Sequence, residues 1–164
     1  MKASKLSLAA LSVTLAMILS FVESQIPAFV AIPGVKIGLT NIVIIYALYK
    51  MGWKYAVVIS LVRVLLVGIL FGNGVSLIYS FAGAVMSFVI MVLLKNVKVF
   101  STMAVSVAGG VTHNMAQIGM ACIIMETNLI SYYAPFLVLS GTLAGIAIGV
   151  ISAIMIKRVD IKTK

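Results

Sequence analysis

Arg63 is the most conspicuous candidate for chemistry, because it lies in the middle of the apolar stretch VISLVRVLLVGIL. An arginine at the centre of a bilayer costs roughly 2.5–3.5 kcal/mol on insertion scales, so it should face the protein interior and have a partner. That partner is either an acid, for which Glu23 is the candidate near the outer half, or the anionic group of a ligand at the base of an outward cavity. Both interpretations stay open.

A second group of polar side chains lies in another apolar segment, THNMAQIGM, at residues 112–120. His113 and Gln117 are four residues apart and share one helix face, and Asn114 and Gln117 are three apart. In lipid these groups need hydrogen-bond partners, so they should point inward, either as bonds between helices or as contacts to a ligand. One histidine and three acids in the whole chain cannot supply a recognisable metal site, and no cofactor is expected.

The longest polar interruption of the N-terminal half is ESQIPAFVAIPGVKIGLTN, Glu23–Asn41. Pro27 and Pro33 prevent the preceding helix from continuing, so we expect this stretch to form a lid over the outer side. Lys36 either extends its ammonium to the membrane interface or joins Arg63 in attracting an anion such as a carboxylate or phosphate.

Asn73 and Tyr79 flank the next outer loop, where they could line the same mouth. The predicted substrate-binding residues are therefore Glu23, Lys36, Asn41, Arg63, Asn73, Tyr79, His113, Asn114 and Gln117. The sequence contains no Walker A motif, HExxH, nucleophile elbow or aspartate-rich pair, so the chain is not expected to be an enzyme.

The elements that must position these residues are apolar helices. Of the 164 residues, 63% are hydrophobic and 9% are charged, whereas a soluble domain carries roughly 25% charged residues. Uncharged runs near the ~20 residues that cross a bilayer predict an all-α, polytopic membrane protein. We expect one integral membrane domain over residues 1–164, a six-transmembrane-helix bundle with spans at about 6–22, 37–50, 54–71, 75–94, 101–125 and 134–156.

The net charge of +9 is spread as short basic groups between alternate apolar runs. Lys2 and Lys5 precede the first run, lysine pairs follow the second and the fourth, and a basic tail follows the sixth. Basic residues favour cytoplasmic loops, so both termini are predicted in the cytoplasm. A nucleic-acid partner is not expected, because it would need these charges clustered on one surface.

The second span is short. Its 14 residues reach only ~21 Å at ~1.5 Å per residue, less than the ~30 Å hydrocarbon core. Part of the Glu23–Asn41 stretch should therefore enter the membrane, which is tolerated only where the backbone is buried in protein or lines a cavity.

Small residues form two ridges that would let another helix approach closely. Ser12 and Ala16 in the first span would dock a partner if they face outward, or contact the protein's own helices if they face inward. Gly141, Gly145 and Gly149 in the sixth span are predicted to pack internally.

The motifs PGVKIGLTNIVIIYAL and GGVTHNMAQI resemble those of the heptaprenyl diphosphate synthase component I family, also called the Gx transporter family. The resemblance covers nearly the whole chain. The size of the chain, its six predicted spans, its predicted lid and the ridge of Ser12 and Ala16 also resemble the S components of energy-coupling factor (ECF) transporters. That resemblance implies a multi-pass subunit of a prokaryotic cell membrane that captures a small molecule from outside. It would dock through Ser12 and Ala16 onto a transmembrane coupling protein powered by two ATPases.

Members of the family are also associated with flavin-based extracellular electron transfer, so the resemblance allows an isoprenoid, quinone-related or flavin-related substrate. Three functions remain as hypotheses. The first is the substrate-binding subunit of an ECF-type transporter, and the second is an accessory membrane subunit in prenyl or quinone metabolism or in electron transfer. The third, a structural bundle without a ligand, leaves the intramembrane polar residues unexplained.

Overall fold

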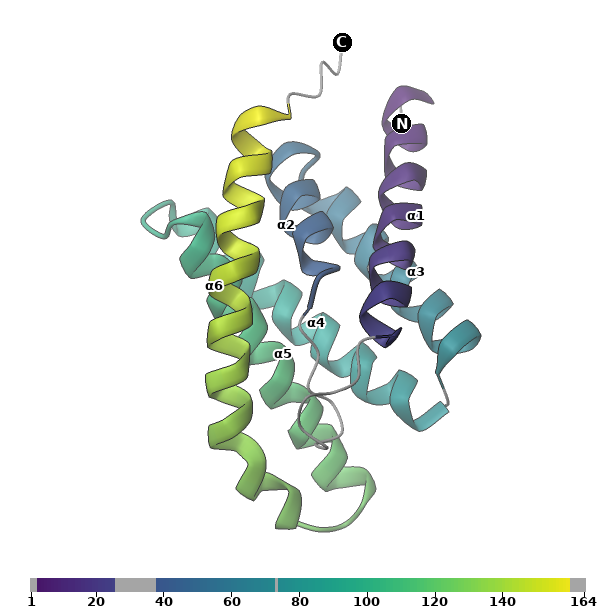
Figure 1. The fold of residues 1–164 in the computed structure, drawn as a ribbon, viewed down its shortest axis with the longest axis vertical. Coiled ribbons are helices and arrows are strands. Elements are labelled where there is room, and N and C mark those ends of the chain that lie inside the picture. Colours follow the sequence, from purple (N-terminus) through teal and green to yellow (C-terminus); the bar gives the residue numbers. More distant parts are fainter. Residues whose placement is uncertain (1–2, 26–37, 73, 160–164) are drawn as a thin grey trace.

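The computed structural model describes residues 3–25, 38–72 and 74–159, which form helices joined by short turns and contain no strand (Figure 1). The α-helices are α1 (Ala3–Gln25), α2 (Asn41–Lys50), α3 (Trp53–Phe71), α4 (Gly74–Val97), α5 (Thr102–Ile124) and α6 (Ala134–Arg158), and a short 3-10 helix, η1 (Leu129–Tyr133), precedes α6. The predicted all-α class is confirmed, and each predicted span overlaps one of these α-helices.

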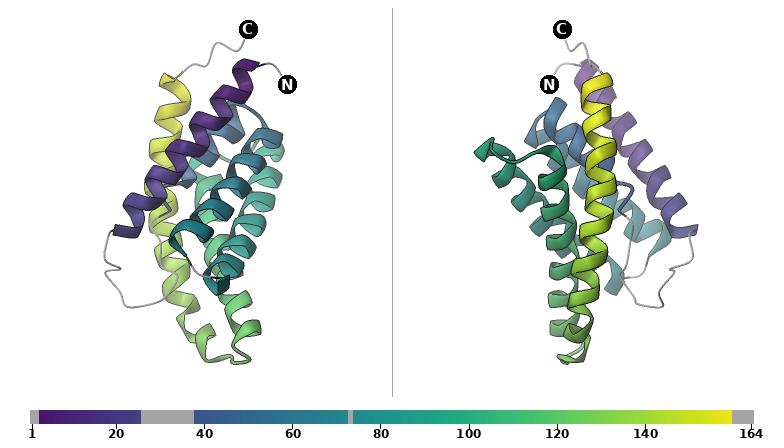
Figure 2. Two further views of the ribbon diagram at one scale, coloured as in Figure 1. Left: turned by 90° about the vertical axis from the view of Figure 1, so that its right-hand side faces the viewer. Right: turned by 60° about the vertical axis from the view of Figure 1, so that its left-hand side comes forward.

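The helices run so that positive charge collects at one end of the molecule. The start of α1, the end of α6 and the turns α2–α3 and α4–α5 lie toward the same end, while η1 lies at the other (Figures 1 and 2). Apart from Arg63, the described basic residues belong to this basic end; they are Lys5, Lys50, Lys54, Lys95, Lys98, Lys157 and Arg158. The described acids lie away from the basic end: Glu23 is in the last turn of α1, and Glu126 is in the turn between α5 and η1.

Four helical segments are long and apolar enough to cross a membrane: Lys5–Gln25, Trp53–Phe71, Gly74–Val97 and Leu129–Arg158. They fit a multi-pass membrane protein. The other two predicted spans differ. The 10 residues of α2 extend only ~15 Å, and α5, although 23 residues long, carries polar residues including His113, Asn114 and Gln117, which lower its hydropathy.

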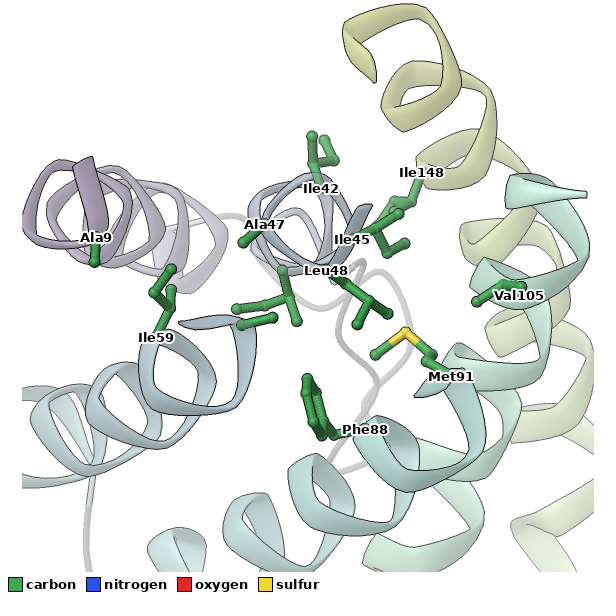
Figure 3. Packing of buried hydrophobic residues seen from close by; sticks show 12 residues of the cluster. Ala9, Ile42, Ile45, Ala47, Leu48, Ile59, Phe88, Met91, Val105 and Ile148 are labelled. Carbon is green, nitrogen blue, oxygen red and sulfur yellow. The ribbon is translucent and has the colours of Figure 1, made fainter. Parts of the chain in front are cut away.

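The short helix α2 fills the centre of the bundle at the basic end. All seven residues from Ile42 to Leu48 are buried, and side chains of α2 approach Met91 of α4 and Ile148 of α6 (Figure 3). A helix segment that is buried on every side needs no polar face, which explains the largely apolar run from Ile42 to Leu48.

The glycine ridge of α6 packs internally, as predicted. A Cβ on Gly145 would lie 2.6 Å from Val107 Cα, and one on Gly149 would lie 2.6 Å from Met103 Cα. A Cβ on Gly110 of α5 would in turn lie 2.8 Å from the carbonyl oxygen of Gly141. The two helices therefore approach backbone to backbone, as small residues at a membrane helix interface allow.

The small-residue ridge of α1 faces inward. Ser12 and Ala16 are 8% and 0% exposed, and α1 packs against α3 and α2. The outer face of α1 instead presents Leu11, Leu15 and Ile18. Of the two interpretations of this ridge, the structure favours contact with the protein's own helices over an exposed docking surface.

Candidate functional site

A polar pocket of about 40 Å³ lies where α1, α2, α3, α5 and α6 meet. The pocket is partly open and has room for roughly three water-sized groups. It brings together five of the predicted binding residues, Glu23, Asn41, Arg63, His113 and Asn114. The other described residues that line it are Gly38, Thr40, Ser106, Gly110, Gly141, Ala144, Gly145 and Ile148.

Arg63 reaches the pocket from the middle of α3. Its side chain is half-buried as a whole, but its Nε is fully enclosed and has no hydrogen-bond partner among the described residues. A buried donor without a partner costs about 1–3 kcal/mol, and more if it is charged. Glu23 attracts it electrostatically, yet the two groups, which line the same pocket, do not form an ion pair in this structure. The guanidinium therefore has an unfilled position for an acceptor.

Glu23 comes from the last turns of α1 and is tied to the segment that leads into α2. Its carboxylate accepts a hydrogen bond from the backbone N–H of Gly38. One turn earlier, the hydroxyls of Ser20 and Thr40 form a buried hydrogen bond of 2.8 Å. These two contacts hold the end of α1 against the start of α2, and they place one carboxylate at the pocket wall.

The start of α2 also faces the pocket, through Thr40 and Asn41. The first N–H groups of α2 bond to preceding carbonyls, for example Asn41 N–H to Gly38 O at 2.8 Å. What the helix contributes is thus the positive end of its dipole, which favours negative charge nearby. The side-chain amide of Asn41 makes no hydrogen bond to the described residues, so both its donor and its acceptor remain available.

His113 and Asn114 reach the pocket from the middle of α5. Asn114 Nδ2 donates to the carbonyl of Leu137 in α6 at 2.9 Å, in a buried hydrogen bond that holds the amide in place. The imidazole of His113 lies against α4, where a Cβ on Gly83 would come within 2.9 Å of Cε1. The absence of a side chain at Gly83 is therefore what leaves room for the ring.

The remaining predicted residues are placed differently. Gln117 is buried one turn beyond His113, with its Cγ also 2.9 Å from the position of a Gly83 Cβ, and it packs against α4 without lining the pocket. Tyr79 is half-buried in α4 and does not line it either. Lys36 and Asn73, with most of the predicted lid, lie outside the described residues.

The sequence analysis missed several lining residues that a simple pattern could have found. Ser106, Gly110 and His113 follow one another at intervals of four and three residues, which places them on one face of α5. Thr40 directly precedes the predicted Asn41. Gly141 and Gly145 were assigned to packing only, but the close approach that they allow also brings backbone to the pocket wall.

The site combines one guanidinium, one carboxylate, one imidazole, two amides and hydroxyl groups. Such a set can hold a small polar molecule through hydrogen bonds and charge. No three His, Cys, Asp or Glu side chains converge to hold a metal ion within the described ranges.

Fold and site together define a class of protein, a multi-pass helical membrane protein with a small polar pocket enclosed among its helices. The chain belongs to the heptaprenyl diphosphate synthase component I family, whose model matches residues 12–155. No curated protein and no solved structure matches it.

Proposed function

We propose that this chain is the substrate-binding membrane subunit of an ECF-type transporter and that it captures a small molecule through an anionic group held by Arg63. The observation that carries the proposal is Arg63, which lines the polar pocket and whose buried Nε has no hydrogen-bond partner among the described residues. An oxygen of a carboxylate or phosphate at this position would remove the cost of leaving the donor unpaired, and hydrogen bonds between charged groups are the stronger kind.

The surroundings of Arg63 support an anionic group. The N-terminal end of α2 adjoins the pocket, and the amide of Asn41 offers a further donor. In secondary transporters, helices that begin within the membrane use the same dipole to hold anionic substrate groups. The proposed role is binding without catalysis.

We further propose six spans with both termini in the cytoplasm. The supporting observation is the basic end, since lysine and arginine favour the cytoplasmic side. In this arrangement α5, which extends ~35 Å, crosses the membrane inside the bundle, where other helices cover its polar groups. The substrate enters from the outer side of the membrane, opposite the basic end. The proposed partners are a transmembrane coupling protein and two ATPases.

The inward-facing ridge of α1 restricts where the coupling protein can dock. Ser12 and Ala16 are buried, so docking through them would require α1 to move away from α2 and α3. A coupling protein that docks without this movement would meet the apolar outer face of α1 instead.

The test is native mass spectrometry of the protein gently extracted from its own membrane, with three forms compared. The unchanged chain and the Arg158→Ala variant, which removes an exposed arginine at the basic end, should both retain a bound small molecule. The Arg63→Ala variant should lose it. Equal retention by Arg63→Ala would remove Arg63 from the binding site. Coupling protein and ATPases in the same preparation would support the transport assignment.

The family name favours a second candidate, an accessory membrane subunit of prenyl metabolism. A related form is an accessory subunit of quinone metabolism or of flavin-based extracellular electron transfer. Either form predicts a stable complex with a prenyl synthase or a flavoprotein, no ATPase module and no dependence of the assembly on Arg63. The same mass spectra therefore separate the two candidates.

A further inference from the structure

The charged residues of the pocket also indicate which further charge the ligand carries besides its anionic group. Among the described lining residues, Arg63 carries one positive charge and Glu23 one negative charge, and the two do not form an ion pair. Apart from His113, the charges of the described lining residues therefore cancel. A purely anionic ligand would leave one net negative charge inside an apolar bundle and would place that charge near Glu23.

Uncompensated charge in a low-dielectric interior is costly, and a like charge nearby adds to the cost. A ligand that carries both signs avoids both penalties, because each of its charges meets the opposite charge on the wall. The hydrogen-bonding groups suit such a ligand. Arg63 Nε is an unfilled donor, whereas the Glu23 carboxylate and Asn114 Oδ1 are acceptors, since the amide of Asn114 is held through its Nδ2 by α6.

On the basis of the proposed function, we infer that the pocket binds a zwitterionic group, with an acidic end on Arg63 and a cationic nitrogen on Glu23. The small volume limits what is enclosed to a few heavy atoms. The zwitterionic part is thus a compact head, of the size of a small amino acid, whether or not the rest of the molecule extends beyond the pocket.

Matched fragments test this inference without knowledge of the natural ligand. Glycine, β-alanine and 4-aminobutyrate carry both charges at increasing separation. Propionate and ethylamine each retain one charged end of β-alanine. Binding of each fragment to the purified full-length chain in detergent is measured by saturation-transfer difference NMR, with titration of those that bind. We expect at least one zwitterion to bind saturably, and propionate and ethylamine to bind at least tenfold more weakly or not at all.

Two charge-removing variants make the test specific. Glu23→Gln retains an oxygen that can accept the N–H of Gly38, so the contact between α1 and α2 can persist while the charge is lost. Its matched control is Glu126→Gln, at an exposed acid outside the pocket. We expect Glu23→Gln and Arg63→Gln each to weaken binding of the zwitterion at least tenfold, while Glu126→Gln leaves it unchanged. Arg63→Lys should restore part of the binding, because it restores the charge.

The outcomes separate this inference from the proposed function. If propionate binds as tightly as β-alanine, or if Glu23→Gln strengthens binding, the ligand group is an anion alone; the zwitterion inference is then overturned and the proposed function stands. If no zwitterion binds, the inference is also overturned. If ligand retention in the mass spectra does not depend on Arg63, the proposed function fails as well.

Discussion

The replacement of Gly145 by alanine tests the packing of α5 on α6 most directly. A Cβ at this position would lie 2.6 Å from Val107 Cα, 3.1 Å from Val107 N and 3.2 Å from the carbonyl oxygen of Ser106. All three atoms are backbone, so no side chain can turn away to make room. To reach the roughly 3.5 Å that two carbon atoms need, the two helices must move apart by roughly 0.9 Å at this crossing.

The expected effect is the balance of two terms. Overpacking a well-packed interface costs typically 1–3 kcal/mol, and a rigid backbone obstacle places this case near the upper value. Alanine instead of glycine in a helix returns up to about 1 kcal/mol. We therefore expect Gly145→Ala to lower the free energy of unfolding by about 2 kcal/mol.

Gly119→Ala is the matched control, because Gly119 lies in α5 and a Cβ there would meet nothing within 4 Å. Only the helix term applies to it, so its stability should stay unchanged or rise by up to about 1 kcal/mol. Both variants and the unchanged chain are unfolded reversibly in mixtures of mild detergent and SDS, and helicity is followed by circular dichroism. Equal stability of the two variants would refute the close backbone approach of α5 and α6.

Three further experiments probe contacts between helices, two of them near the pocket and one at the basic end. Gly83→Ala should push the ring of His113 aside and weaken ligand binding, measured by titration. Overpacking costs typically 1–3 kcal/mol and alanine in the helix returns up to about 1 kcal/mol, so stability should fall by no more than about 2 kcal/mol. Ser20→Ala and Thr40→Val should show a coupling of roughly 0.6–1.5 kcal/mol in a double-mutant cycle of unfolding free energies, since they share one buried hydrogen bond. Lys95→Met should lower stability by about 1 kcal/mol in the same assay, because Nζ of Lys95 bonds at 2.6 Å to a carbonyl near the end of α2; no change would mean that this bond is replaced by water.

Much of the helical architecture could be predicted from hydropathy alone. The predicted segment 54–71 begins one residue after α3 (Trp53–Phe71) and ends with it, and the predicted segment 101–125 is one residue longer at each end than α5 (Thr102–Ile124). The second segment was harder, because residues 37–40 are apolar enough to extend the run but α2 begins at Asn41. Helix ends depend on local turns as well as on hydropathy, and here a turn at Gly38, with a φ of +78°, precedes the helix.

For the candidate site, the sequence predicted which polar residues face the interior but not which residues they contact there. Polar groups within lipid have to face the protein, so Arg63, His113 and Asn114 could be assigned to the interior from their positions alone. Periodicity could not tell which neighbour each would meet. Gln117 and His113 share a face and both pack against Gly83 of α4, yet only His113 also lines the pocket.

The sequence by itself determined the apolar helices, the distribution of basic residues and the presence of a few polar groups that lipid would not tolerate outside. These properties depend on the free energy of transferring each side chain from water to lipid, which is local to the residue. Only the tertiary structure decided that Ser12 and Ala16 face inward, that α6 meets α5 through glycines, and that Glu23 and Arg63 line one pocket without pairing. These outcomes depend on which helix surfaces fit one another, and that fit joins residues far apart in the chain.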